Sequence, residues 1–342
     1  MNPRRSGKKF LFLTVIGLVL LAAAEGVAQV ALRVAYGRAT ESDRLIDYDV
    51  ELGWVNMKNR RAVDRYGPGK HATHNAMGLR AAREYTREIP PGRYRVLFIG
   101  DSFTYGIDVG DDSTYIAQLE RQAPSIEPVN MAVAGYGVDQ MYLSFLRNQS
   151  QLDANLLVLA FIGDDLRRMK LNAFLTQYPK PRLFLQGDGL RVANVPVPAW
   201  GLTARSSWRS EFPNSTALVQ ILRSINDVFV QRYDPLPVAE RVFTSLNDTA
   251  RDRNLRFAVG YLPAQSDVTG PAANPDAAEL SAWAFGAQIP FFDLTDRFKA
   301  AVKARSAPLF VKDGKHYSEA GHTVVAELML DSLRAAFPEV PR

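Results

Sequence analysis

Short apolar runs alternate with amphipathic stretches along most of the chain. The runs cover residues 95–99, 128–133, 156–162, 256–262 and 290–294. The third run is apolar throughout, as in a strand covered on both faces of a parallel sheet. Apolar positions at helical spacing predict helices over 113–122 and 138–147, and Ser318 is placed to cap a closing helix. This alternation predicts a three-layer α/β/α domain around a parallel sheet.

The first 35 residues have a different pattern, a basic tail followed by one long apolar run. Arg4, Arg5, Lys8 and Lys9 precede apolar residues that extend to 24, and a weaker apolar pattern continues to Leu32 across Glu25. Counted to Leu32, the segment can cross a bilayer, which takes about 20 residues. Counted to residue 24, it also fits a secretory signal. Because the basic tail stays in the cytoplasm, we expect an uncleaved transmembrane anchor with the body outside the cytoplasm, rather than a secreted protein.

The rest of the chain divides into a polar preamble and a main domain. Residues 36–92 are rich in turn residues, and we expect them to pack on the domain formed by 93–342. His71 and His74 lie in this preamble with no third ligand at metal spacing, so we expect solvated loop histidines. An insertion at about 170–250 interrupts the main domain. Within it, residues 182–186 and 190–195 flank a glycine-rich turn and predict a β-hairpin.

Composition excludes several classes of site. The 342 residues include no cysteine, which rules out disulfides, thiolate catalysis and cysteine-bound metals. The net charge is +5, and the basic tail supplies four of those charges before any acid occurs. No basic stripe with interleaved aromatic residues stands out, so we expect no nucleic-acid partner. Asp313, His316 and His322 lack further ligands nearby, and we expect neither a metal nor a cofactor.

A serine stands where the first predicted strand ends, in Gly100-Asp101-Ser102. Functional sites of open α/β sheets gather at this carboxyl edge, and a serine needs a base to become a nucleophile. Among the four histidines, His316 has an acid, Asp313, three residues before it, close enough to hold its second ring nitrogen. Ser102, Asp313 and His316 form the candidate triad. His322 remains an alternative base.

Two groups of acids near this serine are assigned structural roles. We expect Asp101 to buttress the turn through hydrogen bonds to the backbone. We expect Asp108, Asp111 and Asp112 to lie in a solvated loop before a helix N-terminus, where negative charge is favoured.

Four segments resemble the ordered blocks of the SGNH/GDSL hydrolase family. Gly100-Asp101-Ser102-Phe103 resembles the first block, Asn130-Met-Ala-Val-Ala-Gly135 the second, Gly163-Asp164-Asp165 the third and Asp313-Gly-Lys-His316 the fifth. The blocks extend over about 94–335. The resemblance implies a flavodoxin-like fold and ester or acyl chemistry. It makes Ser102 the nucleophile and His316 the base, oriented by Asp313, and it assigns the oxyanion hole to the N–H groups of Ser102 and Gly135 and to the side chain at position 164.

Position 164 departs from the family pattern, which has an asparagine there. An ionised carboxylate accepts hydrogen bonds and cannot donate one to an oxyanion. Asp164 could be protonated beside Asp165. It could instead turn away, held by the backbone or by Arg167 or Arg168. The third alternative is that the two backbone donors alone support turnover.

These features predict an extracytoplasmic serine esterase that removes acyl groups from a small molecule, a lipid or a glycan. Leu52-Gly-Trp54 and Gly78-Leu-Arg80 resemble the preamble of membrane-anchored bacterial members, some found with exopolysaccharide machinery. This implies a place in the bacterial inner membrane, a periplasmic domain, polysaccharide-export machinery as a partner and acetyl groups on a glycan as substrate. Two alternatives stay open. One is a polysaccharide O-acetyltransferase that uses the same serine, and the other is a catalytically silent glycan-binding or scaffold protein, which Asp164 makes credible.

Overall fold

The computed structural model describes residues 3–36, 45–175, 178–198, 216–219, 221–222, 225, 233–270, 274–312 and 315–342. Its centre is a five-stranded parallel sheet in the order β6–β5–β7–β12–β13. The strands are β5 (Tyr94–Gly100), β6 (Ile126–Asn130), β7 (Leu156–Phe161), β12 (Arg256–Tyr261) and β13 (Phe291–Asp293). The first strand in the chain lies beside both the second and the third, which is the flavodoxin-like order. The predicted parallel α/β sheet is therefore confirmed.

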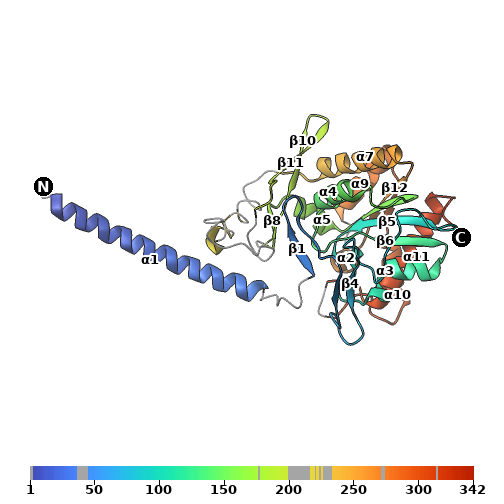
Figure 1. Cartoon of the computed structure of the whole chain (residues 1–342), viewed down its shortest axis with the longest axis horizontal. Helices are drawn as coiled ribbons and strands as arrows, with labels where there is room; N and C mark the ends of the chain where they lie inside the picture. The colour runs from blue at the N-terminus through green and yellow to red at the C-terminus, as the bar shows by residue number, and fades with distance from the viewer. Residues whose placement is uncertain are drawn as a thin grey trace.

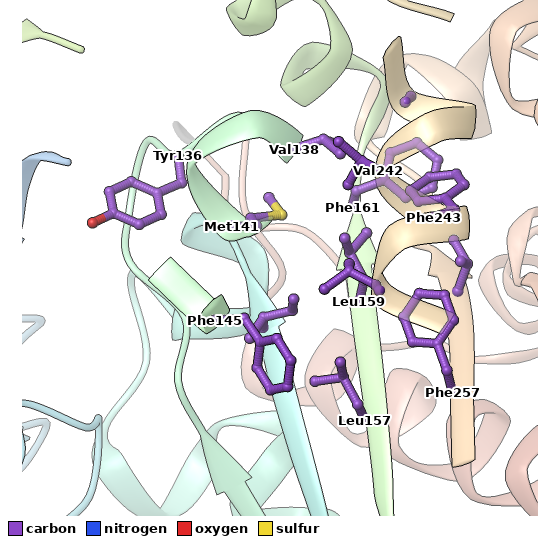
Figure 2. Close-up of a cluster of buried hydrophobic side chains, with 14 of the residues drawn as sticks. Tyr136, Val138, Met141, Phe145, Leu157, Leu159, Phe161, Val242, Phe243 and Phe257 are labelled. Atoms are coloured by element: carbon purple, nitrogen blue, oxygen red, sulfur yellow. The ribbon is translucent and has the colours of Figure 1, made fainter. Parts of the chain in front are cut away.

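The helices cover both faces of this sheet (Figure 1). One face carries α4 (Val138–Asn148), α7 (Leu236–Asp252) and α9 (Pro275–Gly286), and the other carries α3 (Tyr115–Gln122), α10 (Thr295–Ala304) and α11 (Glu319–Ala336). Alternate residues of the middle strand β7 enter opposite cores because successive side chains of a strand point to opposite faces. Leu157, Leu159 and Phe161 face α4 and α7, as Figure 2 shows. Leu156, Val158 and Ala160 face the other way.

Short helices follow the carboxyl ends of several strands. These are α2 (Ser102–Tyr105) after β5, the single turn η2 (Asp111–Ser113) before α3, α5 (Gly163–Met169) after β7 and α8 (Gln265–Thr269) after β12. The predicted closing helix begins as expected, since Ser318 Oγ accepts from the Gly321 N–H at 3.1 Å. The second strand ends earlier than the apolar pattern predicts. Asn130 Nδ2 donates to the Thr104 carbonyl at 2.8 Å and its Oδ1 accepts from the Ala132 N–H, which turns the chain out of the sheet.

The preamble folds into two antiparallel pairs that lie against the main domain. The pairs are β1 (Ile46–Asp49) with β2 (Gly53–Asn56), and β3 (Arg60–Ala62) with β4 (Ala72–His74). Trp54 is buried, and its indole N–H donates to the Ala134 carbonyl at 3.0 Å. Asn56 Nδ2 donates to the Ala132 carbonyl at 3.1 Å. The preamble therefore holds the loop that follows β6.

The described part of the insertion contains two further antiparallel pairs. They are β8 (Ala173–Phe174) with β9 (Tyr178–Pro179), and β10 (Arg182–Gln186) with β11 (Gly189–Ala193). The second pair is the hairpin that the sequence predicts, and Gln186 pairs with Gly189 across its turn. Most of the insertion between 199 and 232 lies outside the described residues.

The N-terminal helix α1 (Pro3–Tyr36) extends away from the body (Figure 1). Its segment Phe12–Ala31 is long and apolar enough to cross a membrane by length and composition, with a mean hydropathy of 2.0, and a signal sequence would pass the same test. Glu25 lies within this segment. Its carboxylate accepts from the N–H groups of Ala217 and Leu218 in the insertion, at 2.8 and 2.9 Å.

Candidate active site

Ser102 begins the short helix α2 at the carboxyl end of β5. Asp101 caps this helix, since its Oδ1 accepts from the Phe103 N–H at 2.9 Å. The buttressing role predicted for Asp101 is confirmed. The strand-to-helix turn is tight, because a Cβ placed on Gly100 would lie 2.4 Å from Thr104 Oγ1. This turn presents the Ser102 hydroxyl at the sheet edge with the residue 6% exposed.

The structure brings His316 to this hydroxyl. His316 Nε2 lies 2.9 Å from Ser102 Oγ, although 214 positions separate the two residues. The loop that carries His316 precedes α11, and the imidazole packs against the Phe103 ring with centroids 5.1 Å apart. A hydroxyl within hydrogen-bond reach of an imidazole can be activated as a nucleophile.

The second nitrogen of His316 faces an acid that the sequence analysis did not assign to it. His316 Nδ1 lies 3.2 Å from Asp108 Oδ2. Asp313, the predicted third member of the triad, lies outside the described residues. The expectation that the acidic run is a solvated loop is wrong for Asp111, whose carboxylate is mostly buried and accepts from Arg80 Nε at 2.8 Å. The same expectation does not include the contact between Asp108 and the imidazole of His316.

The other histidines have structural positions. His322 is buried in α11, and its Nδ1 accepts from the Tyr115 N–H at 3.1 Å. Burial lowers the pKa of His322 to about 3. His74 is also buried, its Nε2 lying 2.8 Å from the Tyr105 hydroxyl, and burial lowers its pKa to about 4. The prediction of a solvated loop is therefore wrong for His74. His71 is partly exposed and accepts from the Asp64 N–H.

Ser102 and Gly135 carry the two backbone N–H groups that the family resemblance assigns to the oxyanion hole. Within the part of the chain that the structure describes, neither the Ser102 nor the Gly135 N–H donates a hydrogen bond. Gly135 has a φ of +84°, in the left-handed region that favours glycine. A Cβ at this position would also lie 2.7 Å from a ring carbon of Phe174. Both features account for glycine at position 135.

Asp164 turns outward rather than toward a reacting centre. Its carboxylate pairs with Arg167, and its side chain is 43% exposed. Among the alternatives that the sequence left open, the structure shows the carboxylate held by a neighbouring arginine. Asp165 takes the buried place, where its Oδ2 accepts from the Ile162 N–H at 2.9 Å and caps α5.

Arg168 connects the acids behind the serine. Its Nη1 donates to Asp101 Oδ2 at 3.0 Å, to the Tyr136 carbonyl at 3.0 Å and to Asp165. One guanidinium cannot neutralise two buried carboxylates. Burial, and then the charge of Asp101, raise the pKa of Asp165 well above its ordinary value against the opposing charge of Arg168. The position of Arg168, three residues after Asp165 on a helix, is a signal for this pairing.

Within the described ranges, no group of three or more histidine, aspartate or glutamate side chains could hold a metal ion.

Solved structures resemble the chain in fold. They include a member of the lipolytic protein G-D-S-L family from Veillonella parvula (11% identity, TM-score 0.43, covering 72% of this chain and 100% of that one). A variant of an acetyl-xylooligosaccharide esterase from Geobacillus has 15% identity and a TM-score of 0.44, covering 72% and 96%. The esterase EstA from Pseudoalteromonas has 11% identity and a TM-score of 0.43, covering 72% and 99%. No protein-family model matches the chain, and no curated protein matches it in sequence.

A serine at a strand end beside a distant imidazole is the arrangement on which serine nucleophiles depend in hydrolases. The solved structures to which the chain is similar include GDSL lipolytic proteins and esterases, and at 11–15% identity this likeness concerns the fold alone.

Proposed function

We propose that the chain is a serine esterase that hydrolyses ester-linked acyl groups through an acyl-enzyme on Ser102. The observation that carries this proposal is the 2.9 Å contact between Ser102 Oγ and His316 Nε2. This distance lies in the range in which a base can take a hydroxyl proton. The N–H groups of Ser102 and Gly135 also support the proposal. Neither donates a hydrogen bond within the described residues, so both are available to an oxyanion.

The reaction follows from these positions. Ser102 Oγ attacks the ester carbonyl carbon as its proton passes to His316 Nε2, and the N–H groups of Ser102 and Gly135 receive the oxyanion. The C–O bond to the alcohol then breaks, and the imidazolium protonates the leaving oxygen. Water then attacks the acyl carbon and gives a proton to His316. The bond between the acyl carbon and Ser102 Oγ breaks, the imidazolium returns the proton to Oγ, and the carboxylic acid leaves. A carboxylate on Nδ1 stabilises the imidazolium in both halves.

An aromatic ring lies against Gly135. The Phe174 ring contacts this glycine, and Arg168 lies over the ring at 5.0 Å from its centroid. Trp54 stacks on Phe174 with centroids 6.1 Å apart, so the ring is held from two sides. The preamble motifs Leu52-Gly-Trp54 and Gly78-Leu-Arg80 are the ground on which we favour acetyl groups on a glycan as the substrate.

The N-terminal helix supports a place at the membrane. A 20-residue apolar segment that follows a basic tail fits a single-pass anchor of the bacterial inner membrane, with the esterase domain in the periplasm. A cleaved signal remains the alternative. Detection of the N-terminal segment in the mature protein, by mass spectrometry of the membrane fraction, separates the two.

The experiment that tests the proposal uses the full chain, a fluorophosphonate probe and a chromogenic acetyl ester. The wild-type chain is expected to be labelled on Ser102 and to hydrolyse the ester, and Ser102→Ala is expected to lose both reactions. Retained hydrolysis in Ser102→Ala, or a wild-type chain inert toward both reagents, would reject the proposal. Inertness with intact folding is the result expected of a silent glycan-binding protein.

A second experiment separates the esterase from the O-acetyltransferase. Both form the same acyl-enzyme and differ in whether water or a sugar hydroxyl resolves it. An acetylated donor is incubated with the chain and a soluble polysaccharide, and free acetate and acetylated polysaccharide are quantified. We expect free acetate to account for most of the product. Transfer to the polysaccharide at a comparable rate would identify the transferase.

A further inference from the structure

Both ring nitrogens of His316 contact residues of the chain segment that follows β5. Nε2 faces Ser102 Oγ at 2.9 Å and Nδ1 faces Asp108 Oδ2 at 3.2 Å. Ser102 and Asp108 lie at the start and near the end of the same short segment after β5. A carboxylate on Nδ1 leaves Nε2 without a proton, which is the tautomer that can accept a proton from a serine.

Asp108 adopts a backbone conformation that aspartate seldom uses. Its φ is +72°, in the left-handed region, which costs an ordinary L-residue about 1–2 kcal/mol. Such a conformation persists where the surroundings fix it, and it is found at functional sites. A glycine here would relieve the strain. The aspartate therefore adds a carboxylate at a position where the backbone itself favours a residue without a side chain.

The chain on both sides of Asp108 is fixed. The Gly106 and Ile107 N–H groups both donate to the Ser102 carbonyl, at 3.0 and 3.1 Å. On the other side, the Val109 carbonyl accepts from Arg80 Nη2 at 3.0 Å. Arg80 belongs to the preamble and is buried. The preamble therefore sets the position of the loop that carries Asp108.

The charge of Asp108 is directed to the imidazole. Across the described residues, no lysine or arginine forms an ion pair with Asp108, and its side chain is 36% exposed. The nearby guanidinium of Arg80 is engaged by Asp111 and by the Val109 carbonyl. The guanidinium of Arg80 thus pairs with Asp111 and not with Asp108. The Asp108 carboxylate interacts with His316 instead.

We propose that Asp108 is the positioning carboxylate of His316, accepting from Nδ1–H and fixing the imidazole toward Ser102. This inference rests on the proposed esterase function and deepens it. It supplies the acid from the loop after the serine, six residues along the chain, whereas the family resemblance supplies it from Asp313, three residues before the histidine.

The kinetic test compares Asp108→Asn with Asp112→Asn. Asp112 belongs to the same acidic loop, is exposed and pairs with Ser113 rather than with His316, so its variant removes the same charge without touching the imidazole. We expect Asp108→Asn to lower kcat for a chromogenic acetyl ester by about 10²–10⁴-fold with KM within about threefold. Asp112→Asn is expected to stay within about twofold of wild type in both constants.

A second variant separates positioning from folding. Asp108→Gly relieves the left-handed strain, so its midpoint of urea unfolding is expected to equal or exceed that of wild type while kcat falls as in Asp108→Asn. A residue with a purely structural role would not show lost turnover together with retained stability.

A spectroscopic readout tests the contact without turnover. An imidazole N–H that donates to a carboxylate gives a low-field proton resonance. We expect this resonance in the wild-type chain and in Asp313→Asn, and its loss in Asp108→Asn and in His316→Gln. If the chain proves inert toward every ester, the proposed function fails, and the resonance still decides the role of Asp108. Resonance and kcat retained in Asp108→Asn but lost in Asp313→Asn would overturn the inference.

Discussion

Ser102 lies between two carboxylates that meet different partners. On one side, the Arg168 flank consists of Asp101, Arg168 and Asp165, and both of its acids are fully buried. On the other side, the His316 flank consists of His316 and Asp108, which are partly exposed to solvent. The first flank holds a permanent cation, and the second holds an imidazole within hydrogen-bond reach of Ser102 Oγ.

The difference shows which acids can take part in chemistry. Asp101 shares the Arg168 guanidinium and also caps α2 through the Phe103 N–H. The Asp101 carboxylate therefore stabilises the turn that presents Ser102. Asp108 has no such cation within the described residues and faces the base. In the proposed reaction, the buried flank therefore fixes the position of Ser102, and the exposed flank receives its proton.

Replacement of Arg168 by methionine is expected to have the largest effect on stability. It leaves Asp101 and Asp165 buried without a cation, a change that typically costs about 3–5 kcal/mol. The measurement is the free energy of unfolding in urea. Arg167→Met is the matched control, because Arg167 pairs with Asp164 at the surface and such pairs contribute less than about 1 kcal/mol. Equal losses in the two variants would contradict the assignment of the Arg168 flank.

Replacement of Arg80 by methionine tests the support of the His316 flank. It removes the hydrogen bonds to Asp111 and to the Val109 carbonyl, and bonds to charged groups contribute about 1.5–3 kcal/mol. We expect a comparable loss in unfolding free energy and a lower kcat, because the loop that carries Asp108 is released.

A double variant shows whether Arg80 acts through Asp108. If it does, Arg80→Met lowers kcat in the wild-type background and has little further effect in Asp108→Asn, since coupled residues are not additive. Equal factors in both backgrounds would show that Arg80 affects turnover by another route.

Acid is expected to destabilise the region beneath the His316 flank. The His322 ring lies between the rings of Tyr115 and Tyr317, and its lowered pKa reflects burial first, then the charges of His316 and Arg80 against that of Asp108. The unfolded chain binds a proton at about pH 6.5, whereas folded His322 does so near 3. The contribution of neutral His322 to the free energy of unfolding is therefore complete above about pH 6.5, and it is lost as the pH falls below that value.

Linkage gives the size of this acid effect. Between pH 7 and pH 5, a histidine that is buried in its neutral form is expected to lower the free energy of unfolding by about 2 kcal/mol. His74, with a pKa of about 4, contributes a similar slope. Urea unfolding at pH 7, 6 and 5 measures the total, and His322→Gln is expected to remove about half of it. An unchanged slope in that variant would place the acid sensitivity elsewhere.

The sequence predicts the sheet and the serine–histidine pair because both depend on strong local patterns. Short apolar runs and the Gly100-Asp101-Ser102 turn are visible without coordinates. Asp108 could not be assigned, because nothing in its neighbours reveals that the backbone at 108 turns left-handed and aims the carboxylate at a residue 208 positions away. The burial of His74 is not visible in the sequence, because the polar residues around it do not indicate that Tyr105 covers it.

The smallest expected effect concerns Asp164, which lies beside the Arg168 flank but outside it. Because Asp164 is exposed and paired with Arg167, Asp164→Asn should change the unfolding free energy by less than about 1 kcal/mol. The same change removes a negative charge at the position where the family pattern has an asparagine, and it introduces an amide that can donate. We therefore expect esterase activity to be kept or raised, measured as kcat/KM for the chromogenic ester. A folded but inert Asp164→Asn variant would show that the carboxylate itself is needed, and that position 164 does not correspond to the family's oxyanion donor.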